Sequence, residues 1–217
     1  MIDLKTTKGY LSKPSGNGPF PAIIVLQEWW GLNDNIKEIV DRFAKEGFLA
    51  LAPDLYRGTV AQNKVEAQSL VDNLSLEAGL LICLEAVDYL KTSGLAGKIG
   101  VTGFCMGGKY ALFLASKSTE ISACAPFYGH VPQPPQNLEG IKCPVLGNYA
   151  QADDGIKPEE VQLLKDTLTK YGVDHEIIIY PGAHHSFMND KGENYNPEIA
   201  KQAWDKTISF FKKHLNQ

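Results

Sequence analysis

The chain has 217 residues, of which 44% are hydrophobic, and its formal net charge at pH 7 is -4. This length predicts one larger domain, and the mild acidity gives no argument for binding nucleic acid or an anionic membrane. The first residues, MIDLKTTKGYL, contain no apolar signal core, and no apolar run is long enough to span a bilayer. We therefore expect one domain over residues 1–217, a cytoplasmic location, and no nucleic-acid or membrane partner.

The cysteines are scattered along the chain without the paired spacing of a disulfide framework or a zinc site. This pattern is typical of reduced thiols in a cytoplasmic protein. Nor do the histidines and carboxylates show the spacing of metal ligands. We expect no disulfide, metal or cofactor, and the cysteines concerned are Cys83, Cys105, Cys124 and Cys143.

Short apolar segments alternate with longer amphipathic segments. An N-terminal strand and a Gly- and Pro-rich turn at residues 14–21 come first. Further strands are expected at Ala22–Gln27, Leu49–Ala52, Ile99–Thr102, Ala123–Phe127, Pro144–Tyr149 and Glu176–Tyr180. Helices are expected at Asn35–Glu46, Leu74–Thr92, Gly107–Ser116, Glu159–Tyr171 and Pro197–Leu215, with a surface loop at Pro132–Gln136. This alternation predicts an α/β fold with a mostly parallel sheet and helices on both faces, whose functional groups gather at the carboxyl ends of the strands.

One cysteine stands where a strand is expected to turn into a helix. Cys105 follows the strand IGVT, and the segment GFCMG has the G-x-C-x-G spacing of a nucleophile turn with cysteine in place of serine. Gly103 and Gly107 allow the strand and the helix to pack closely. The turn places the sulfur at a helix N-terminus, which favours a thiolate, and leaves the N–H of Met106 free to stabilise an oxyanion. A buried, inert thiol is the ordinary alternative, which suits the other three cysteines better.

Two nucleotide-binding motifs overlap this segment. GFCMGGK, residues 103–109, fits G-x-x-x-x-G-K, but Tyr110 follows where a phosphate-binding loop needs Ser or Thr to hold magnesium. A dinucleotide fingerprint would need glycine in place of Cys105. Both alternatives are therefore weak.

A cysteine nucleophile needs a base, and the base needs an orienting acid. His184 and His185 lie in the loop PGAHHSFMND, which follows a late strand and otherwise would be an ordinary solvated loop. Asp153 and Asp154 follow the preceding strand, where aspartates before a helix are also ordinary caps. The chain order of cysteine, aspartate and histidine after successive strands is that of α/β-hydrolase triads.

A carboxylate also ends the first buried strand. Glu28 follows AIIVLQ, and a carboxylate in this place is costly unless it has a partner. We expect its strand to lie near the Cys105 strand, so that Glu28 faces the thiol. The alternative is a solvated loop residue beside the packing side chains of Trp29 and Trp30.

Together these residues resemble the dienelactone hydrolase family (carboxymethylenebutenolidases), whose members have a single-domain α/β-hydrolase fold. The resemblance covers nearly the whole chain, and the cysteine turn combined with QEWWGLN is a specific pairing. The segments that carry it are GYLSKP, PFPAIIVLQEWWGLND, FAKEGFLALAPDLYRG, GVTGFCMGGKYAL, FYG, ADDGI and PGAHHSF.

The resemblance implies a role for each site residue. Cys105 would be the nucleophile and His185 the base, because the family histidine directly precedes a small residue and Phe. The family pattern A-D-x-G-I selects Asp153 as the acid, whereas D-x-x-x-P selects Asp154, and we prefer Asp153. Glu28 matches the glutamate that holds the resting thiol neutral until substrate arrives. The backbone N–H groups of Trp29 and Met106 would form the oxyanion hole.

Substrate binding departs from the family pattern. Members that cleave dienelactone bind the substrate carboxylate with two arginines, but here Arg57 lies one place early and Asn189 replaces the second arginine. Tyr128, in FYG, is the third residue that the resemblance places at the substrate. Each charged hydrogen bond that is lost should remove about 1.5–3 kcal/mol of the binding preference for an anionic substrate. We therefore expect neutral esters or lactones to compete well with carboxylate-bearing ones.

The sequence thus predicts a carboxylic ester hydrolase, of class EC 3.1.1, that cleaves small esters or lactones through a cysteine acyl-enzyme. We expect a monomer whose partner is a small-molecule substrate. The alternative is a non-catalytic ligand-binding or thiol redox-sensing protein on the same fold, because an exposed thiolate also suits a sensor.

Overall fold

A computed structural model of the chain describes residues 1–216, and in this part eight strands form one sheet. The strands lie in the order β1-β2-β4-β3-β5-β6-β7-β8; β2 is antiparallel to both of its neighbours, β1 and β4, and all other adjacent strands are parallel. Their bounds are β1 Ile2–Asp3, β2 Lys8–Ser12, β3 Phe20–Leu26, β4 Leu49–Pro53, β5 Ala96–Phe104, β6 Ile121–Phe127, β7 Val145–Ala150 and β8 His175–Tyr180. The mostly parallel sheet predicted from the sequence is confirmed.

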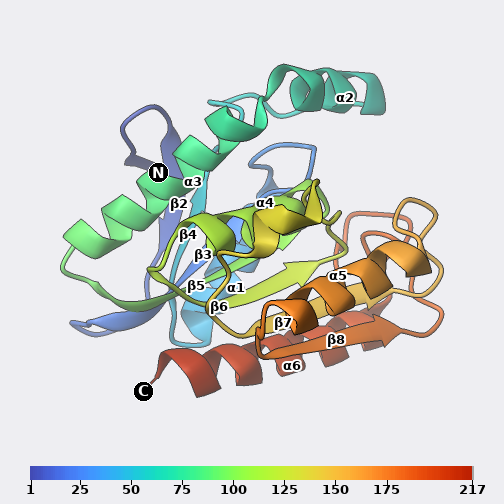
Figure 1. Cartoon of the computed structure of the whole chain (residues 1–217). Helices are drawn as coiled ribbons and strands as arrows, with labels where there is room; N and C mark the ends of the chain where they lie inside the picture. Colours follow the sequence, from blue (N-terminus) through green and yellow to red (C-terminus); the bar gives the residue numbers. More distant parts are fainter. Residues whose placement is uncertain (217) are drawn as a thin grey trace.

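Helices cover both faces of this sheet, as predicted. Helices α3 and α4 lie on one face and α6 on the other (Figure 1). The helices are α1 Asp34–Lys45, α2 Lys64–Asn73, α3 Leu76–Thr92, α4 Met106–Lys117, α5 Pro158–Lys170 and α6 Pro197–Leu215, with a short 3₁₀ helix at Pro135–Leu138. None of these described helices is both long and apolar enough to cross a membrane.

The central strands explain why the chain folds this way. Five consecutive residues of β3, Ala22–Leu26, are buried, as expected for a strand covered by helices on both faces. Below the sheet, Phe43 of α1 packs against Trp204 and Phe211 of α6, with ring centroids 4.6 and 6.1 Å apart. These contacts hold the helices against the sheet. They thereby help to position the edge of the sheet at which the parallel strands end.

Helix α2 is the α-helix that the sequence patterns missed. Ala67 alone is buried among its ten residues, all of which the structure describes, so α2 lacks an apolar stripe. Its start is nevertheless encoded: the Asn63 side chain accepts a hydrogen bond from the Glu66 N–H, and the Glu66 carboxylate accepts from the Gln62 N–H. This reciprocal capping is the signal that would have found the helix.

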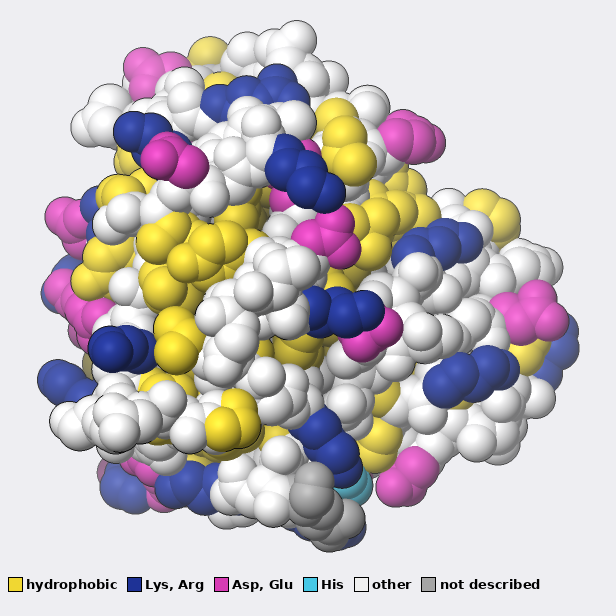
Figure 2. All heavy atoms as spheres, turned by 90° about the vertical axis from the view of Figure 1, so that its left-hand side faces the viewer, with side chains coloured by type: hydrophobic (Ala, Val, Ile, Leu, Met, Phe, Trp, Pro, Cys, Tyr) yellow, Lys and Arg dark blue, Asp and Glu magenta, His cyan; other side chains and the backbone are white. Residues whose placement is uncertain are grey.

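The face seen from the left of Figure 1 carries lysine, arginine and acidic side chains interspersed among hydrophobic ones (Figure 2). No single charge dominates this view. Such a mixture suits the low net charge of the chain.

Candidate active site

Cys105 occupies the sharp turn between β5 and α4. Its backbone has φ 53° and ψ -115°, a conformation that costs a non-glycine residue on the order of 1–3 kcal/mol. A hydrogen bond ties this turn to the adjacent strand β6, because the Cys105 N–H donates to the Phe127 carbonyl oxygen at 3.1 Å. The strained turn expected from the sequence is therefore present.

The flanking glycines are required by close backbone packing. A Cβ atom at Gly103 would overlap the Gly107 carbonyl oxygen, and one at Gly107 would overlap the carbonyl oxygens of Leu26 and Gln27. Helix α4 thus starts in direct contact with the end of β3. This contact brings the Cys105 turn next to Glu28 and the residues that follow it.

Two backbone N–H groups are free at this junction. Within residues 1–216, neither Trp29 nor Met106 donates its backbone N–H to a protein acceptor. Met106 is the first residue of α4, where an N–H has no partner inside the helix. Both residues lie at the ends of the neighbouring strands β3 and β5, so their N–H groups suit the stabilisation of an anion.

His185 and Asp153 form a close pair in the loops after β8 and β7. The His185 Nδ1 atom lies 2.7 Å from Asp153 Oδ2. The other carboxylate oxygen, Oδ1, accepts from the backbone N–H groups of Gly155 and Ile156, at 2.9 and 3.0 Å. The aspartate is therefore fixed in place before it orients the histidine.

The protonation of the pair follows from these contacts. Burial alone would lower the pKa of His185, but the hydrogen bond to Asp153 and the neighbouring Cys105 sulfur outweigh it and raise the pKa to about 10. Burial raises the pKa of Asp153, yet the hydrogen bonds from His185, Ile156 and Gly155 prevail and lower it. The attraction from Cys105 is that of a thiolate, so the charged form of His185 is the one that follows transfer of the Cys105 proton.

The structure separates the doubled residues of the sequence. Asp153 is buried and contacts His185, whereas Asp154 is exposed. His184 is likewise exposed, while His185 lines the same cleft as Cys105.

Glu28 is buried behind the turn and is 1% exposed. Its Oε2 atom accepts from Asn189 Nδ2 at 2.9 Å, and within residues 1–216 its Oε1 atom has no hydrogen-bond partner. Burial raises the pKa of Glu28, and Ser186, Asn189 and the nearby His185 only partly oppose this effect. The contact expected between Glu28 and the thiol is not among the hydrogen bonds that Glu28 makes in this structure; Asn189 holds the carboxylate instead.

A cleft of about 610 Å³ opens above these groups. Its walls include Cys105, His185, Asn189 and Trp29, which the sequence had singled out. The remaining lining residues are Trp30, Lys64, His130, Gly155, Ser186, Lys191, Gly192, Glu193 and Asn194.

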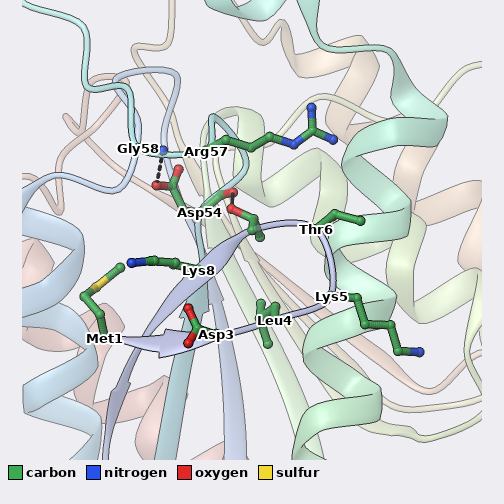
Figure 3. A pocket seen from close by; sticks show the side chains of 10 residues that line it. Met1, Asp3, Leu4, Lys5, Thr6, Lys8, Asp54, Arg57 and Gly58 are labelled. Atoms are coloured by element: carbon green, nitrogen blue, oxygen red, sulfur yellow. Dashed lines mark hydrogen bonds between the residues drawn. The ribbon is translucent and has the colours of Figure 1, made fainter.

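Two residues expected at the substrate lie elsewhere. Arg57 lines a different cavity, beside Met1, Lys8 and Asp54 at the N-terminal strands (Figure 3). Tyr128 is buried beneath the cleft, where its ring packs 5.1 Å from the His185 ring. The structure thus brings Asn189 to the cleft, keeps Tyr128 below it, and does not bring Arg57 there.

The sequence patterns also missed residues of the cleft, among them His130 and Lys64. The Nδ1 atom of His130 lies 3.1 Å from Glu160 Oε1, and this histidine lines the wall of the cleft. Lys64 begins the unpredicted helix α2. Within residues 1–216, no cluster of three or more histidine, cysteine or acidic side chains is arranged to hold a metal ion.

The sheet order and the strand–turn–helix around Cys105 define an α/β hydrolase. A model of the dienelactone hydrolase family matches residues 7–215, so the chain belongs to that family. It is therefore a hydrolase, and its similarity to curated carboxymethylenebutenolidases supports the carboxylic ester hydrolase class.

Relatives match over nearly their full length. The chain is 40% identical to "Protein usf" of Aquifex pyrophilus, over 96% of this chain and 94% of the relative. It is 38% identical, with the same coverage, to a "Putative carboxymethylenebutenolidase" of Aquifex aeolicus. Among solved structures, a "Putative Dienelactone Hydrolase" from Klebsiella pneumoniae superposes with a TM-score of 0.87 at 28% identity, over 94% of this chain and 92% of that chain.

Proposed function

We propose that the protein hydrolyses small carboxylic esters or lactones through a covalent thioester on Cys105. The observation that carries this proposal is the His185–Asp153 pair, 2.7 Å apart, beside a cysteine held on a strained strand–helix turn. A nucleophile, a base and an orienting acid within contact of one another are the parts that acyl transfer needs.

The first half of the cycle forms the thioester. His185 Nε2 takes the Cys105 proton, because Nδ1 is occupied by Asp153. The sulfur attacks the carbonyl carbon, and the free N–H groups of Trp29 and Met106 stabilise the oxyanion. As the carbonyl reforms, the bond to the alkoxy group breaks and that oxygen takes the proton from His185.

The second half releases the acid. His185 removes a proton from water, the hydroxide adds to the thioester carbon, and the C–S bond then breaks. The sulfur recovers its proton from His185, and the carboxylic acid leaves. Before substrate arrives, Glu28 Oε1 is the acceptor proposed for the Cys105 S–H, since this atom has no partner within residues 1–216.

The test compares the loss of the thiol in the cleft with the loss of a thiol in the protein interior. Cys105→Ala should lower kcat for p-nitrophenyl acetate and for dihydrocoumarin by at least about 10³-fold, as loss of a triad nucleophile does. Cys143→Ala removes a buried thiol away from the cleft and should keep most activity if the variant is folded. Thermal unfolding of both variants checks that condition.

Two results would overturn the proposal. One is a folded Cys105→Ala variant that keeps more than a small fraction of wild-type turnover. The other is wild-type protein whose Cys105 reacts readily with iodoacetamide but which turns over neither an ester nor a lactone.

A further inference from the structure

The cleft continues into a second hollow. This hollow, of about 690 Å³, shares Trp29 and Lys64 with the Cys105 cleft. Its other walls come from α2, namely Val65, Gln68, Ser69, Asp72 and Asn73. One surface therefore runs from the nucleophile, past the Trp29 indole, onto α2.

Helix α2 presents an unusual surface to this hollow. The side chain of Val65 is hydrophobic, yet this residue is 81% exposed. Within the described chain, Ala67 is the one residue of α2 that is buried. The helix projects from the body of the molecule beyond the end of the sheet (Figure 1). Trp29 and Val65 are the two apolar side chains among the residues that line this hollow.

The basic side chains that line the cleft differ in whether they form ion pairs. Lys191 lies 3.5 Å from Glu38 and 3.6 Å from Asp190, so it is already paired. His130 is likewise paired with Glu160. Lys64 has no carboxylate within ion-pair distance in residues 1–216, and it stands where the two hollows meet.

The sheet order shows which part of an ester would reach Lys64. Asp153 and His185 follow β7 and β8, on one side of the Cys105 strand β5, whereas Lys64 follows β4, on the other side. The leaving oxygen must lie near His185 to receive its proton. The acyl chain is then the part of the substrate that extends toward Trp29 and α2.

We propose that Trp29, Lys64 and Val65 form an acyl subsite for an extended chain that ends in a carboxylate. The methylene groups would pack on Trp29 and Val65, and the terminal carboxylate would pair with the Lys64 ammonium. This inference rests on the proposed function at Cys105 and gives the enzyme a preferred substrate class, the monoesters of longer dicarboxylic acids.

The experiment uses a matched pair of substrates. Mono-p-nitrophenyl adipate and p-nitrophenyl hexanoate have acyl chains of equal length and differ in the terminal carboxylate. In Lys64→Met the kcat/KM ratio of adipate to hexanoate should fall about three- to fivefold, mainly through KM, as expected for an exposed charge pair. It should fall further in Lys64→Glu.

Two controls separate this subsite from general effects. Lys165→Met removes an exposed lysine of α5 and should leave the ratio unchanged. Val65→Asp should lower kcat/KM for hexanoate more than for acetate, because it places a charge beside the methylene chain.

A binding measurement keeps the inference separate from the proposed function. Monomethyl adipate should slow iodoacetamide modification of Cys105 in wild type and less so in Lys64→Met, whether or not the ester is hydrolysed. An unchanged adipate-to-hexanoate ratio in both Lys64 variants, or equal protection in wild type and Lys64→Met, would overturn the subsite. Loss of all ester turnover with protection intact would instead contradict the proposed function.

Discussion

The turn after β5 and the helix after β4 reach the same cleft with very different support. Around Cys105 the backbone of α4 touches that of β3 so closely that Gly103 and Gly107 admit no side chain. Helix α2 begins with a cleft residue, Lys64, yet buries only Ala67 within its described length. The difference teaches that the proposed catalytic groups stand on packed backbone, whereas part of the proposed substrate surface stands on an element that can change at little cost to stability.

The largest effect expected on the packed side comes from the histidines. His185→Ala should reduce kcat for p-nitrophenyl acetate by about 10³-fold or more, because it removes the proposed base. His184→Ala is the matched control, since this neighbouring side chain is exposed and it is His185 that pairs with Asp153. Steady-state kinetics would contradict the assignment if the two variants exchanged these effects.

The next effect tests the packing itself. Gly107→Ala should lower the free energy of unfolding by about 2 kcal/mol or more, because the new methyl group overlaps the carbonyl oxygens of Leu26 and Gln27. A Cβ at Gly97, also in the β5–α4 segment, meets its nearest atom at 3.5 Å, so Gly97→Ala should cost far less. Urea unfolding measures both, and equal losses would show that the turn is not tightly packed.

The smallest expected effect is the pH dependence of the His185–Asp153 pair. The pKa of His185 is raised to about 10, so its stabilising contribution is complete below about pH 6.5 and disappears as the pH rises through 10. The lowered pKa of Asp153 adds stability that is lost only in acid. Asp153→Asn should therefore cost about 1.5–3 kcal/mol at pH 6 and clearly less at pH 10.5.

This loss is measured by urea unfolding at the two pH values. Asp154→Asn changes an exposed carboxylate and serves as the control, with little cost at either pH. A penalty for Asp153→Asn that grew with pH would reverse the sign of the proposed linkage.

The sequence allowed most of the fold to be predicted because its buried strands and long helices carry strong patterns. Consecutive apolar residues marked β3, and the glycines around Cys105 marked the turn. Helix α2 was missed because propensity and capping, not an apolar stripe, define it. Lys64 was missed with it, since nothing in a polar segment shows which cation will reach a cleft.

The coordinates support the choices made between neighbouring residues. Asp153 and Asp154 each fit one family pattern, and the 2.7 Å contact between Asp153 and His185 agrees with the preference for Asp153. For Arg57 the sequence was misleading. This residue stands one place earlier in its turn than the family arginine, and it lines a different cavity from that of Cys105 (Figure 3). Backbone direction in a loop is set by long-range packing that local sequence does not encode.

The central claim is that hydrolysis passes through a thioester on Cys105. Acid quenching during turnover of p-nitrophenyl acetate, followed by intact-mass and peptide measurement, tests it most directly. The account predicts one acetyl group per chain, on the peptide that contains Cys105, and none in Cys105→Ala. An acetyl group on another residue, or rapid turnover with no adduct at any time, would contradict it.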